Sequence, residues 1–580
     1  MSAIFSRVKL NRRQVIIMVV FVAIASVAQM VSPTLVSMMI DAVSNSNQSI
    51  IIGLAIAMAV LSLVACATNV VATNLSATIA TKFSADLRKE LFRKVQSFSA
   101  VEIDKFGSAS LISRNTTDVN VIQSFLIMLF RVGLLAPMLA AIGLVFAVAT
   151  TGQLALVLAV AIPIVVVVIA FILIRASQHS IKLRNMIDKI NQLFLETLEG
   201  VRVIRAFNKQ GHEMGRFNKT NEEATEVSRK SIAISGMLMP VVNFLFGLTS
   251  VGAMLVGSYL VAKNQLDVAA LVAATQYINM ILIAIVLLAM VIALFPDAYA
   301  CMKRIGDVLQ TEAQITDSQK GGCERTCRGT VEFRNVTFAY PGADEPVIKG
   351  IDFVSRPGET TAIIGRTGCG KSSVVKLIPR LYDTLFGDVL VDGVNVKDYK
   401  LDELRELIGY VPQKNVLFTG DIASNLNFGN ENGTEEDWKE AVRIACADEF
   451  VEKKDNTYHY TVAQGGTNFS GGQRQRLAIA RAVMKKPEIY IFDDSFSALD
   501  MKTDKTLRQN LKESMGEATM IVVAQRVNTI MDATRILVLE DGEVVGMGTH
   551  KELLGSCKLY REIAEIQLGE EEVKNELQSA

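Results

Sequence analysis

The residues best suited to do chemistry lie in a glycine-rich run from Gly365 to Ser372. The run fits the pattern G-x-x-x-x-G-K-[ST] and directly follows a short β-rich segment, 361–364. Its glycines let backbone N–H groups close around phosphates, Lys371 reaches the terminal phosphates, and the hydroxyl of Ser372 suits Mg²⁺. A glycine-rich turn with a purely structural role would not explain Lys371. The residues predicted to bind a nucleotide here are Gly365, Arg366, Thr367, Gly368, Cys369, Gly370, Lys371, Ser372 and Ser373.

A second run, 489–494, supplies the acid that a phosphoryl-transfer site requires. Residues 489–492 form an apolar, β-rich segment, typical of a buried strand, that ends in Asp493 and Asp494. Such a strand delivers Asp493 toward a metal ion bound with the phosphates. The two runs together predict binding of a nucleotide with Mg²⁺, and Ser372 and Asp493 are expected to be metal ligands.

The elements that position these residues belong to a chain with two different halves. Of its 580 residues, 50% are hydrophobic and 20% are charged, and the mean hydropathy is +0.32. Soluble proteins are less apolar and more highly charged. Residues 1–312 carry 26 Lys and Arg against 17 Asp and Glu, whereas residues 313–580 carry 33 against 42. The net charge of zero argues against nucleic-acid binding, which needs a dense basic surface.

The first half has the pattern of a membrane domain with six transmembrane helices. Each of its six apolar stretches exceeds the roughly 20 residues that cross a bilayer as a helix. Lys and Arg gather in segments 1–13, 82–120 and 175–230, which places both termini in the cytoplasm. The two longer basic segments contain few Gly or Pro residues, so the helices are expected to continue beyond the membrane. The predicted spans are about 14–40, 49–78, 121–148, 153–174, 231–262 and 268–296.

Arg131 is the one charged residue well inside a predicted span. An ionisable residue at such a position indicates a functional site by default, here a substrate pathway. Two further roles stay open, because the side chain can also reach the membrane surface or bind a helix carbonyl. The polar residues within the spans either line a cavity or bond neighbouring helices; they include Asn69, Asn74, Gln276 and Asn279.

The second half begins with a polar linker, 313–329, and continues as a soluble domain, 330–568, with a polar tail, 569–580. Short β-rich segments alternate with helical patterns, and the first segments suggest an added antiparallel strand, so an α/β domain is expected. Within the linker, Cys323 and Cys327 have no His or second Cys pair nearby, which favours a loop over a zinc site.

A third motif carries a resemblance to a known family. The run from Phe469 to Gln473, Phe-Ser-Gly-Gly-Gln, resembles the signature of ATP-binding cassette (ABC) proteins. Six spans followed by one such domain resemble an ABC exporter half-transporter, and the resemblance covers nearly the whole chain. It implies a membrane all-α domain of six transmembrane helices with long cytoplasmic extensions, fused to a soluble α/β P-loop ATP-binding cassette domain.

The resemblance also implies roles for further residues. Tyr340 corresponds to the aromatic residue that stacks on adenine, and Gln413 to a glutamine that senses the metal and is implied to be a third metal ligand. In this family ATP lies between the phosphate loop of one domain and the signature of its partner. The residues implied to serve the partner's nucleotide are Ser470, Gly471, Gly472 and Gln473, and Asp500 ends the loop that crosses the dimer. Segments 111–118 and 200–207 resemble those that carry the coupling helices, and 464–466 resembles the exporter-specific loop.

Two positions depart from the family pattern in ways that bear on catalysis. Asp494 stands where most active members have Glu, and Gln525 stands where most have a His that contacts the γ-phosphate. The Asp side chain is one methylene shorter, and a misplacement of about 1 Å can cost about 100-fold in rate. Glutamine cannot be protonated as imidazole can. The site is therefore expected to bind ATP and to hydrolyse it poorly.

The signature, by contrast, matches the family except for Phe469 in place of Leu. A matching signature is useful only to a partner with a competent site, so the sequence predicts a heterodimer with a related half-transporter that has the catalytic Glu and the switch His. The predicted function is ATP-driven export of amphipathic drugs or lipids across a bacterial cell membrane, with the soluble domain in the cytoplasm. The alternatives are a nucleotide-gated channel or regulator, a lipid flippase, and a peptide exporter.

Overall fold

The computed structural model describes residues 4, 11–150, 152, 154–318 and 325–578. The chain divides into two compact units. The helical unit comprises Met1–Gln96 and Gly107–Thr311, and the mixed unit comprises Ser97–Phe106 and Glu312–Ala580. A short segment from the first half of the sequence therefore belongs to the same unit as the second half.

The helical unit is built from long helices. Six of those described are long and apolar enough to cross a membrane, which confirms the predicted membrane domain. They cover Arg12–Ser44, Gln48–Gln96, Ser108–Ala149, Leu156–Glu199, Gln210–Ala262 and Val268–Gln310. The elements are α2 (Arg12–Ser44), α3 (Gln48–Gln96), α5 (Ser108–Ser113), the π-helical turn η1 (Arg114–Asp118), α6 (Val119–Met128), the π-helical turn η2 (Leu129–Gly133), α7 (Leu134–Thr150), α8 (Ala155–Glu199), α9 (Val201–Ala206), α10 (Gln210–Gly236), α11 (Leu238–Ala262) and α12 (Val268–Gln310).

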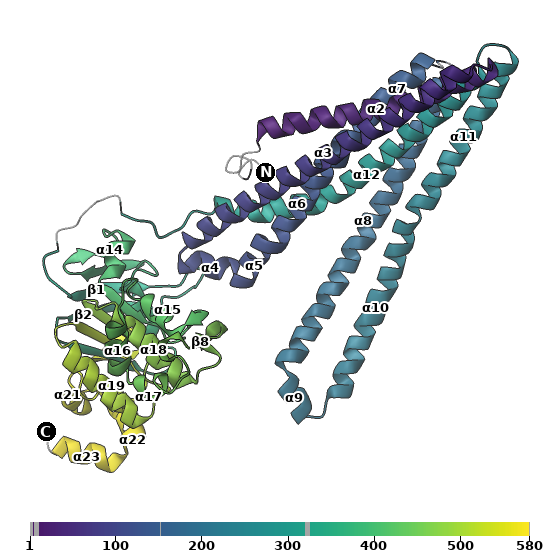
Figure 1. The fold of residues 1–580 in the computed structure, drawn as a ribbon. Coiled ribbons are helices and arrows are strands. Elements are labelled where there is room, and N and C mark those ends of the chain that lie inside the picture. Colours follow the sequence, from purple (N-terminus) through teal and green to yellow (C-terminus); the bar gives the residue numbers. More distant parts are fainter. Residues whose placement is uncertain (1–3, 5–10, 151, 153, 319–324, 579–580) are drawn as a thin grey trace. The chain divides into compact units, whose positions relative to one another are not determined.

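Several of these helices are much longer than a span. Helix α3 has 49 residues and α8 has 45, so each is about 70 Å long at 1.5 Å per residue, against a hydrocarbon core of about 30 Å. Helices α8 and α10 run side by side and are joined through the short helix α9 (Figure 1). The expected helical extensions are thus present, and segment 200–207 is the turn of this hairpin.

Helix α12 is the centre of packing in the helical unit. It contacts α2, α6, α7, α8 and α11, and small residues let the helices approach closely. A Cβ atom at Gly143 of α7 would lie 2.9 Å from Cγ1 of Ile281 on α12. Near one end of α12, the buried carboxylate of Asp118 accepts hydrogen bonds of 2.8 and 2.6 Å from the guanidinium of Arg304. This ion pair fixes η1 against α12.

The mixed unit contains two main sheets. The larger sheet has six strands in the order β12-β11-β3-β10-β9-β6, and all neighbours are parallel except the β11–β12 pair. The smaller sheet has four antiparallel strands in the order β2-β1-β4-β5. This arrangement confirms the predicted α/β domain with an antiparallel addition. The strands are β1 (Val331–Phe338), β2 (Ile348–Ser355), β3 (Thr360–Gly365), β4 (Phe386–Val391), β5 (Val394–Asn395), β6 (Ile408–Val411), β7 (Gly420–Asp421), β8 (Thr461–Val462), β9 (Ile489–Asp493), β10 (Thr519–Val523), β11 (Arg535–Glu540) and β12 (Glu543–Gly548).

Helices cover the larger sheet. Strands β3, β9 and β10 are therefore buried along most or all of their length, as parallel strands generally are. The segment predicted as a polar tail forms a helix, α23, whose Val573 is buried against the domain. The helices are α4 (Ala100–Phe106), α13 (Lys371–Leu377), α14 (Leu401–Glu406), α15 (Ile422–Asn427), α16 (Glu435–Ile444), α17 (Asp448–Val451), η3 (Thr457–His459), η4 (Gln464–Gly466), α18 (Gly471–Met484), α19 (Met501–Ser514), α20 (Val527–Ile530), α21 (His550–Ser556), α22 (Lys558–Leu568) and α23 (Glu570–Gln578).

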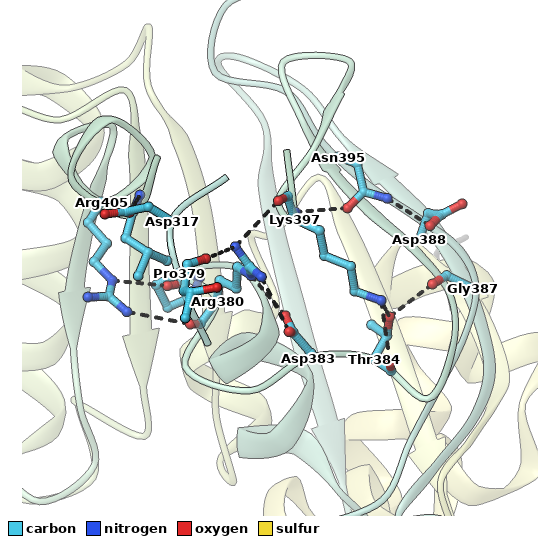
Figure 2. Close-up of polar contacts among 12 residues, drawn as sticks. Asp317, Pro379, Arg380, Asp383, Thr384, Gly387, Asp388, Asn395, Lys397 and Arg405 are labelled. Atoms are coloured by element: carbon cyan, nitrogen blue, oxygen red, sulfur yellow. Dashed lines mark hydrogen bonds and ion pairs between the residues drawn. The ribbon is translucent and has the colours of Figure 1, made fainter. Parts of the chain in front are cut away.

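The described part of the predicted linker packs on the domain that follows it. Figure 2 shows the side chain of Arg380 at the centre of this contact, where it donates to Asp383 at 2.9 Å and to the carbonyl of Lys397 at 3.4 Å. The same guanidinium donates to the carbonyl of Thr316 at 3.1 Å, and Asp317 accepts from the backbone N–H of Leu401 at 2.9 Å. The linker is thereby fixed to the start of α14.

The start of the linker also contacts α4. The buried carboxylate of Glu102 accepts hydrogen bonds from the backbone N–H groups of Ser99 at 2.8 Å and Gln314 at 3.1 Å. Cys323 lies outside the described residues. Cys327, the second cysteine of that pair, is exposed. No group of three or more potential metal ligands occurs among the described His, Cys, Asp and Glu residues.

Candidate nucleotide site

The phosphate-binding loop lies at the end of β3, a central strand of the larger sheet, and leads into α13. Two glycines in it have no room for a side chain. A Cβ atom at Gly365 would lie 2.1 Å from the carbonyl oxygen of Leu539, and one at Gly370 would lie 2.9 Å from that of Val347. Gly370 also has a φ of +97°, a left-handed conformation that glycine adopts readily. The backbone of this loop can therefore approach a phosphate group closely, at the N-terminus of a helix.

Lys371 and Ser372 lie at the first turn of α13. The ammonium group of Lys371 is largely buried and donates to the carbonyl oxygens of Gly365 and Arg366, both at 2.8 Å. The hydroxyl of Ser372 donates to Oδ1 of Asp493 at 2.6 Å. The predicted phosphate ligand and two of the three predicted metal ligands, Ser372 and Asp493, thus meet at the ends of β3 and β9.

These groups fit ATP with Mg²⁺. A hydroxyl and a carboxylate oxygen within hydrogen-bonding distance of each other are ligands that Mg²⁺ prefers, with nucleotide phosphates and water completing its shell. The ammonium group of Lys371 supplies the positive charge for terminal phosphate oxygens. Ser372 and Asp493 would hold the metal ion, which neutralises charge on the phosphates when bound.

Tyr410, on β6, is a member of the site that the motifs did not predict. Its hydroxyl donates to Oδ2 of Asp493 at 3.3 Å. Burial raises the pKa of Tyr410, and the carboxylate of Asp493 raises it further, so the phenol remains a neutral donor. The parallel pairing of β6 with β9 places Tyr410 beside that carboxylate; the only sequence signal was the position of Tyr410 in the strand before Gln413.

The two residues that depart from the family pattern, Asp494 and Gln525, are joined by a hydrogen bond. Nε2 of Gln525 donates to Oδ2 of Asp494 at 2.9 Å, and Nε2 of Gln413 donates to the same oxygen at 3.3 Å. Burial raises the pKa of the Asp494 carboxyl, with the carboxylate of Asp493 acting in the same direction against the hydrogen bond from Gln413. Both donors are neutral amides, so neither can carry a proton away from this carboxylate.

The backbone around Gln525 is held by a residue that the motifs also missed. Gln567, near the end of α22, donates through Nε2 to the carbonyl oxygen of Gln525 and accepts through Oε1 from the backbone N–H of Val527, both at 2.8 Å. Its side chain therefore bridges two backbone groups of the segment that follows β10. Nothing in the sequence marks this residue, since it is one of several polar residues on α22.

Tyr340 lies beside the phosphate loop rather than within it. Its hydroxyl is 2.9 Å from the hydroxyl of Ser373, and its ring contacts that of Tyr382 edge to face, with the centroids 5.1 Å apart. Tyr382 in turn donates to Oδ2 of Asp104 on α4 at 3.2 Å. Burial, followed by the carboxylate of Asp104, raises the pKa of Tyr382 to about 12.

The signature residues form a separate group. Ser470 caps α18, since its hydroxyl accepts from the backbone N–H of Gln473 at 3.3 Å while the Gln473 side chain accepts from the Ser470 N–H at 3.0 Å. Gly471 is exposed, and a Cβ at Gly472 would lie 3.0 Å from the carbonyl oxygen of Ala498. Among the described residues, no side chain of this group hydrogen-bonds to the phosphate loop.

The remaining predicted residues take peripheral positions. Asp500 caps α19 by accepting from the backbone N–H of Thr503 at 3.0 Å, and its hydrogen bonds with Thr503 lower its pKa. Arg366 is exposed and lies 3.4 Å from Glu562. Thr367 and Gly368 are exposed, and Cys369 is buried below the loop.

Comparison with known proteins agrees with this geometry. Residues 15–286 match the ABC transporter transmembrane region, and residues 348–497 match the ABC transporter family. The chain is 37% identical to an ABC transporter ATP-binding protein of Mycobacterium tuberculosis over 564 residues, 96% of each chain. It is 31% identical to the ATP-dependent lipid A-core flippase of Syntrophus aciditrophicus over 500 residues, 86% of this chain and 83% of that protein.

The fold has a solved counterpart in a bacterial Atm1-family ABC exporter with ATP bound. The two structures superpose with a TM-score of 0.80 at 23% identity, covering 95% of this chain and 97% of that one. The match extends through six apolar helices and the nucleotide-binding domain in one polypeptide. The chain therefore belongs to the ABC transporter family and is a half-transporter with the exporter fold, in which one membrane domain is fused to one ATP-binding domain.

Proposed function

We propose that this chain is one subunit of a heterodimeric exporter, in which it holds an impaired ATP site and completes the active site of its partner. The carrying observation is the pair of amide hydrogen bonds, from Gln413 and Gln525, to a single oxygen of Asp494. The group that would position the attacking water is a short carboxylate held by neutral donors. A carboxylate in this arrangement has neither the reach of Glu nor a protonatable partner.

Binding of ATP does not depend on these two residues. Lys371, Ser372 and Asp493 form the phosphate and metal end of the site, and Tyr340 provides an aromatic ring for the base. This combination supports a site that retains ATP for long periods and turns it over slowly.

The signature supports the second part of the proposal. Ser470 and Gly471 lie at the exposed N-terminus of α18, where backbone N–H groups can bind a phosphate from another subunit. In a homodimer, this signature would face only copies of Asp494 and Gln525. With a related partner that has the catalytic Glu and the switch His, this signature completes a site that can hydrolyse ATP.

The proposed cargo is an amphipathic small molecule, a drug or a lipid, moved across a bacterial cell membrane from the cytoplasmic side. The excess of Lys and Arg between the apolar segments supports a cytoplasmic location for the ATP-binding domain. The likeness to a protein named as a lipid A-core flippase favours a lipid, so lipid flipping is the second candidate. Channel recording in planar bilayers would identify the nucleotide-gated alternative.

The test compares the chain purified alone with the chain purified with its natural partner. Alone, it should bind ATP and show little ATPase activity, because every composite site would contain Asp494 and Gln525. With the partner, ATPase activity should appear. Lys371→Ala in the isolated chain serves as the background control, and robust turnover that this change abolishes would contradict the proposal.

A further inference from the structure

A groove with a volume of about 1040 Å³ lies in the mixed unit, at the edge of the larger sheet opposite the phosphate loop. Glu488 and Tyr490 line it at the start of β9, and Ala518 lines it just before β10. Strand β9 has five residues, at about 3.3 Å each, and ends at Asp493. The groove is therefore separate from the nucleotide site. Its volume is that of a pocket for a small organic molecule.

Three helices end at this groove. The last residues of α16, α18 and α19 all line it, and they are Ile444, Met484 and Ser514. Helix α16 contacts both α18 and α19 (Figure 1). The basic side chains in the last turns of these helices do not line the groove; they are Arg443, Arg481 and Lys512. Because the C-terminal end of a helix carries partial negative charge, the three ends favour a cation in the groove.

The side chains of the groove add further negative charge. Five carboxylates line it against two cationic groups. Nζ of Lys486 lies 3.2 Å from Asp437 and 3.8 Å from Glu440. Nε of Arg328 lies 3.1 Å from Glu488. Both cationic groups are thus already paired, and an excess of carboxylates remains.

Glu513 and Glu517, at and just after the end of α19, carry this excess. Both are exposed and line the groove, and neither has a cationic partner among the residues that the structure describes. Glu513 accepts a hydrogen bond from Nε2 of Gln509 at 2.9 Å. No group of three or more metal-binding side chains occurs in the described chain. The two carboxylates therefore fit an organic cation better than a metal ion.

Tyr490 indicates a ligand independently of these charges. Its side chain lines the groove although it is only 1% exposed. Its hydroxyl has no hydrogen-bond partner in the described part of the chain. Burial raises the pKa of Tyr490, so the phenol stays neutral and can both donate and accept. A buried hydroxyl without a partner is costly, and a ligand in the groove would supply that partner.

The inner wall of the groove is apolar. Ile444, Val483 and Met484 are buried side chains that line it, and Met515 and Ala518 line it as partly buried side chains. Such a wall binds the hydrocarbon part of a ligand, because the contact removes apolar surface from water. A ligand that fits both the wall and the carboxylates has an apolar body and a positive charge.

We propose that this groove is a binding site for an organic cation with an apolar body, such as an arylalkyl ammonium ion. The carboxylates of Glu513 and Glu517 would attract the ammonium group, and the hydroxyl of Tyr490 would accept a hydrogen bond from it. The apolar body would lie on the buried wall. The site is formed by this chain alone and does not depend on the proposed heterodimer. A bound cation would contact the end of α18, the helix that begins at the signature.

The experiment measures the binding of two probes that differ in charge. They are para-fluorobenzylamine, which is cationic at neutral pH, and para-fluorobenzyl alcohol, which is neutral and similar in size. The full-length chain, in the assembly in which it is purified, is placed in nanodiscs of phosphatidylcholine, and fluorine NMR relaxation gives the affinity for each probe. Empty nanodiscs correct for partition into the bilayer. A non-hydrolysable ATP analogue is added as a competitor.

The unmodified protein should bind the amine about tenfold more tightly than the alcohol, as one charge-assisted contact implies. Glu513→Gln with Glu517→Gln should lower the affinity for the amine about tenfold and leave that for the alcohol unchanged. Tyr490→Phe should lower the affinity for the amine about fivefold, because one hydrogen bond is lost. The matched control is Glu435→Gln with Glu436→Gln, two exposed carboxylates of α16 that do not line the groove. It should change neither affinity.

These changes should spare the fold, because the carboxylates are exposed and the Tyr490 hydroxyl has no partner among the described residues. Binding of a fluorescent ATP analogue reports the folding of each variant. High salt supplies a test that needs no variant, since it should weaken binding of the amine and leave that of the alcohol unchanged.

Any one of four results would overturn the inference. They are equal affinities for the amine and the alcohol, an equal loss in the control and in the Glu513 and Glu517 variant, an unchanged affinity in Tyr490→Phe, and displacement of the amine by the ATP analogue. The last result would place the amine in the nucleotide site rather than in the groove.

Discussion

The phosphate end of the ATP site and the signature of the same domain differ in what they retain for catalysis. At the phosphate end, Lys371, Ser372 and Asp493 are in place, but the neighbouring Asp494 is held by two glutamine amides. At the signature, the reciprocal hydrogen bonds between Ser470 and Gln473 are complete. On the proposed function, the changes affect the half that acts on this chain's own nucleotide and spare the half that a partner would use.

The difference lies in side chains rather than in the backbone. Strands β9 and β10 pair in register from Ile489 with Thr519 to Asp493 with Val523, and the N–H of Asp494 donates to the carbonyl of Val523 at 3.0 Å. The position of residue 494 is thus fixed by the sheet. A longer carboxylate at this point would start from the same Cα, so the impairment that we propose should be reversible by substitution.

The strongest test of the comparison is to damage the signature. Ser470→Ala combined with Gly471→Glu should reduce ATP hydrolysis by the heterodimer about 100-fold or more, because the phosphate-binding helix end of the partner's site is lost. Asp494→Asn in this chain should change the same rate less than twofold. Steady-state ATPase measurements on the purified pair compare the two variants. Equal losses would show that this chain's own site also hydrolyses ATP.

The chain offers a matched control for that variant. Among the described residues outside its own helix backbone and chain neighbours, a Cβ at Gly471 would have one heavy atom within 4 Å, Cβ of Ala498 at 3.9 Å, so a methyl group there fits without disturbing its own domain. Gly471→Ala should therefore leave the fold intact, and a Gly471→Glu variant that still binds ATP at this chain's own site would localise the effect to the partner's site.

The second test restores the missing groups. Asp494→Glu with Gln525→His should raise ATP hydrolysis at this chain's own site about tenfold or more, since a longer carboxylate and a protonatable imidazole replace two groups that act on one transition state. Each single change should do less, because residues acting together are not additive. The assay uses a partner whose catalytic Glu is changed to Gln, so only this site reports.

If the double variant binds ATP and remains as slow as the parent, the cause of the impairment lies outside residues 494 and 525. The partner's signature would then be the next place to examine. Lys371→Ala added to the double variant is the control, and it should remove the restored activity by removing the phosphate ligand.

Much of this arrangement could be predicted from the sequence because it depends on local chemistry. The pattern Gly365 to Ser372 specifies a loop by its glycines, and an apolar strand specifies where Asp493 ends up. The hydrogen bonds from Tyr410 and Gln567 could not be predicted, because they depend on which strands pair and on where α22 packs. Likewise, nothing in a polar linker shows that Thr316 and Asp317 will meet Arg380 and α14.

The smallest expected effect concerns Gln567, which positions the segment carrying Gln525 without touching the nucleotide. Its side chain donates to one backbone group and accepts from another, both at 2.8 Å; at about 0.5 kcal/mol each, the two hydrogen bonds are together worth about 1 kcal/mol, or about fivefold in a rate that depends on them. Gln567→Met, similar in size, should therefore lower the activity of the restored Asp494→Glu and Gln525→His site about fivefold. Gln567→Glu keeps the acceptor for Val527 but places a carboxylate oxygen against the carbonyl oxygen of Gln525, so its loss should be at least as large. In the unrestored chain neither change should alter the heterodimer's ATPase rate, because on the proposed function that rate comes from the partner's site. An equal decrease in both backgrounds would mean that Gln567 supports the domain as a whole, and the distinction drawn between the two halves of the site would lose its structural basis.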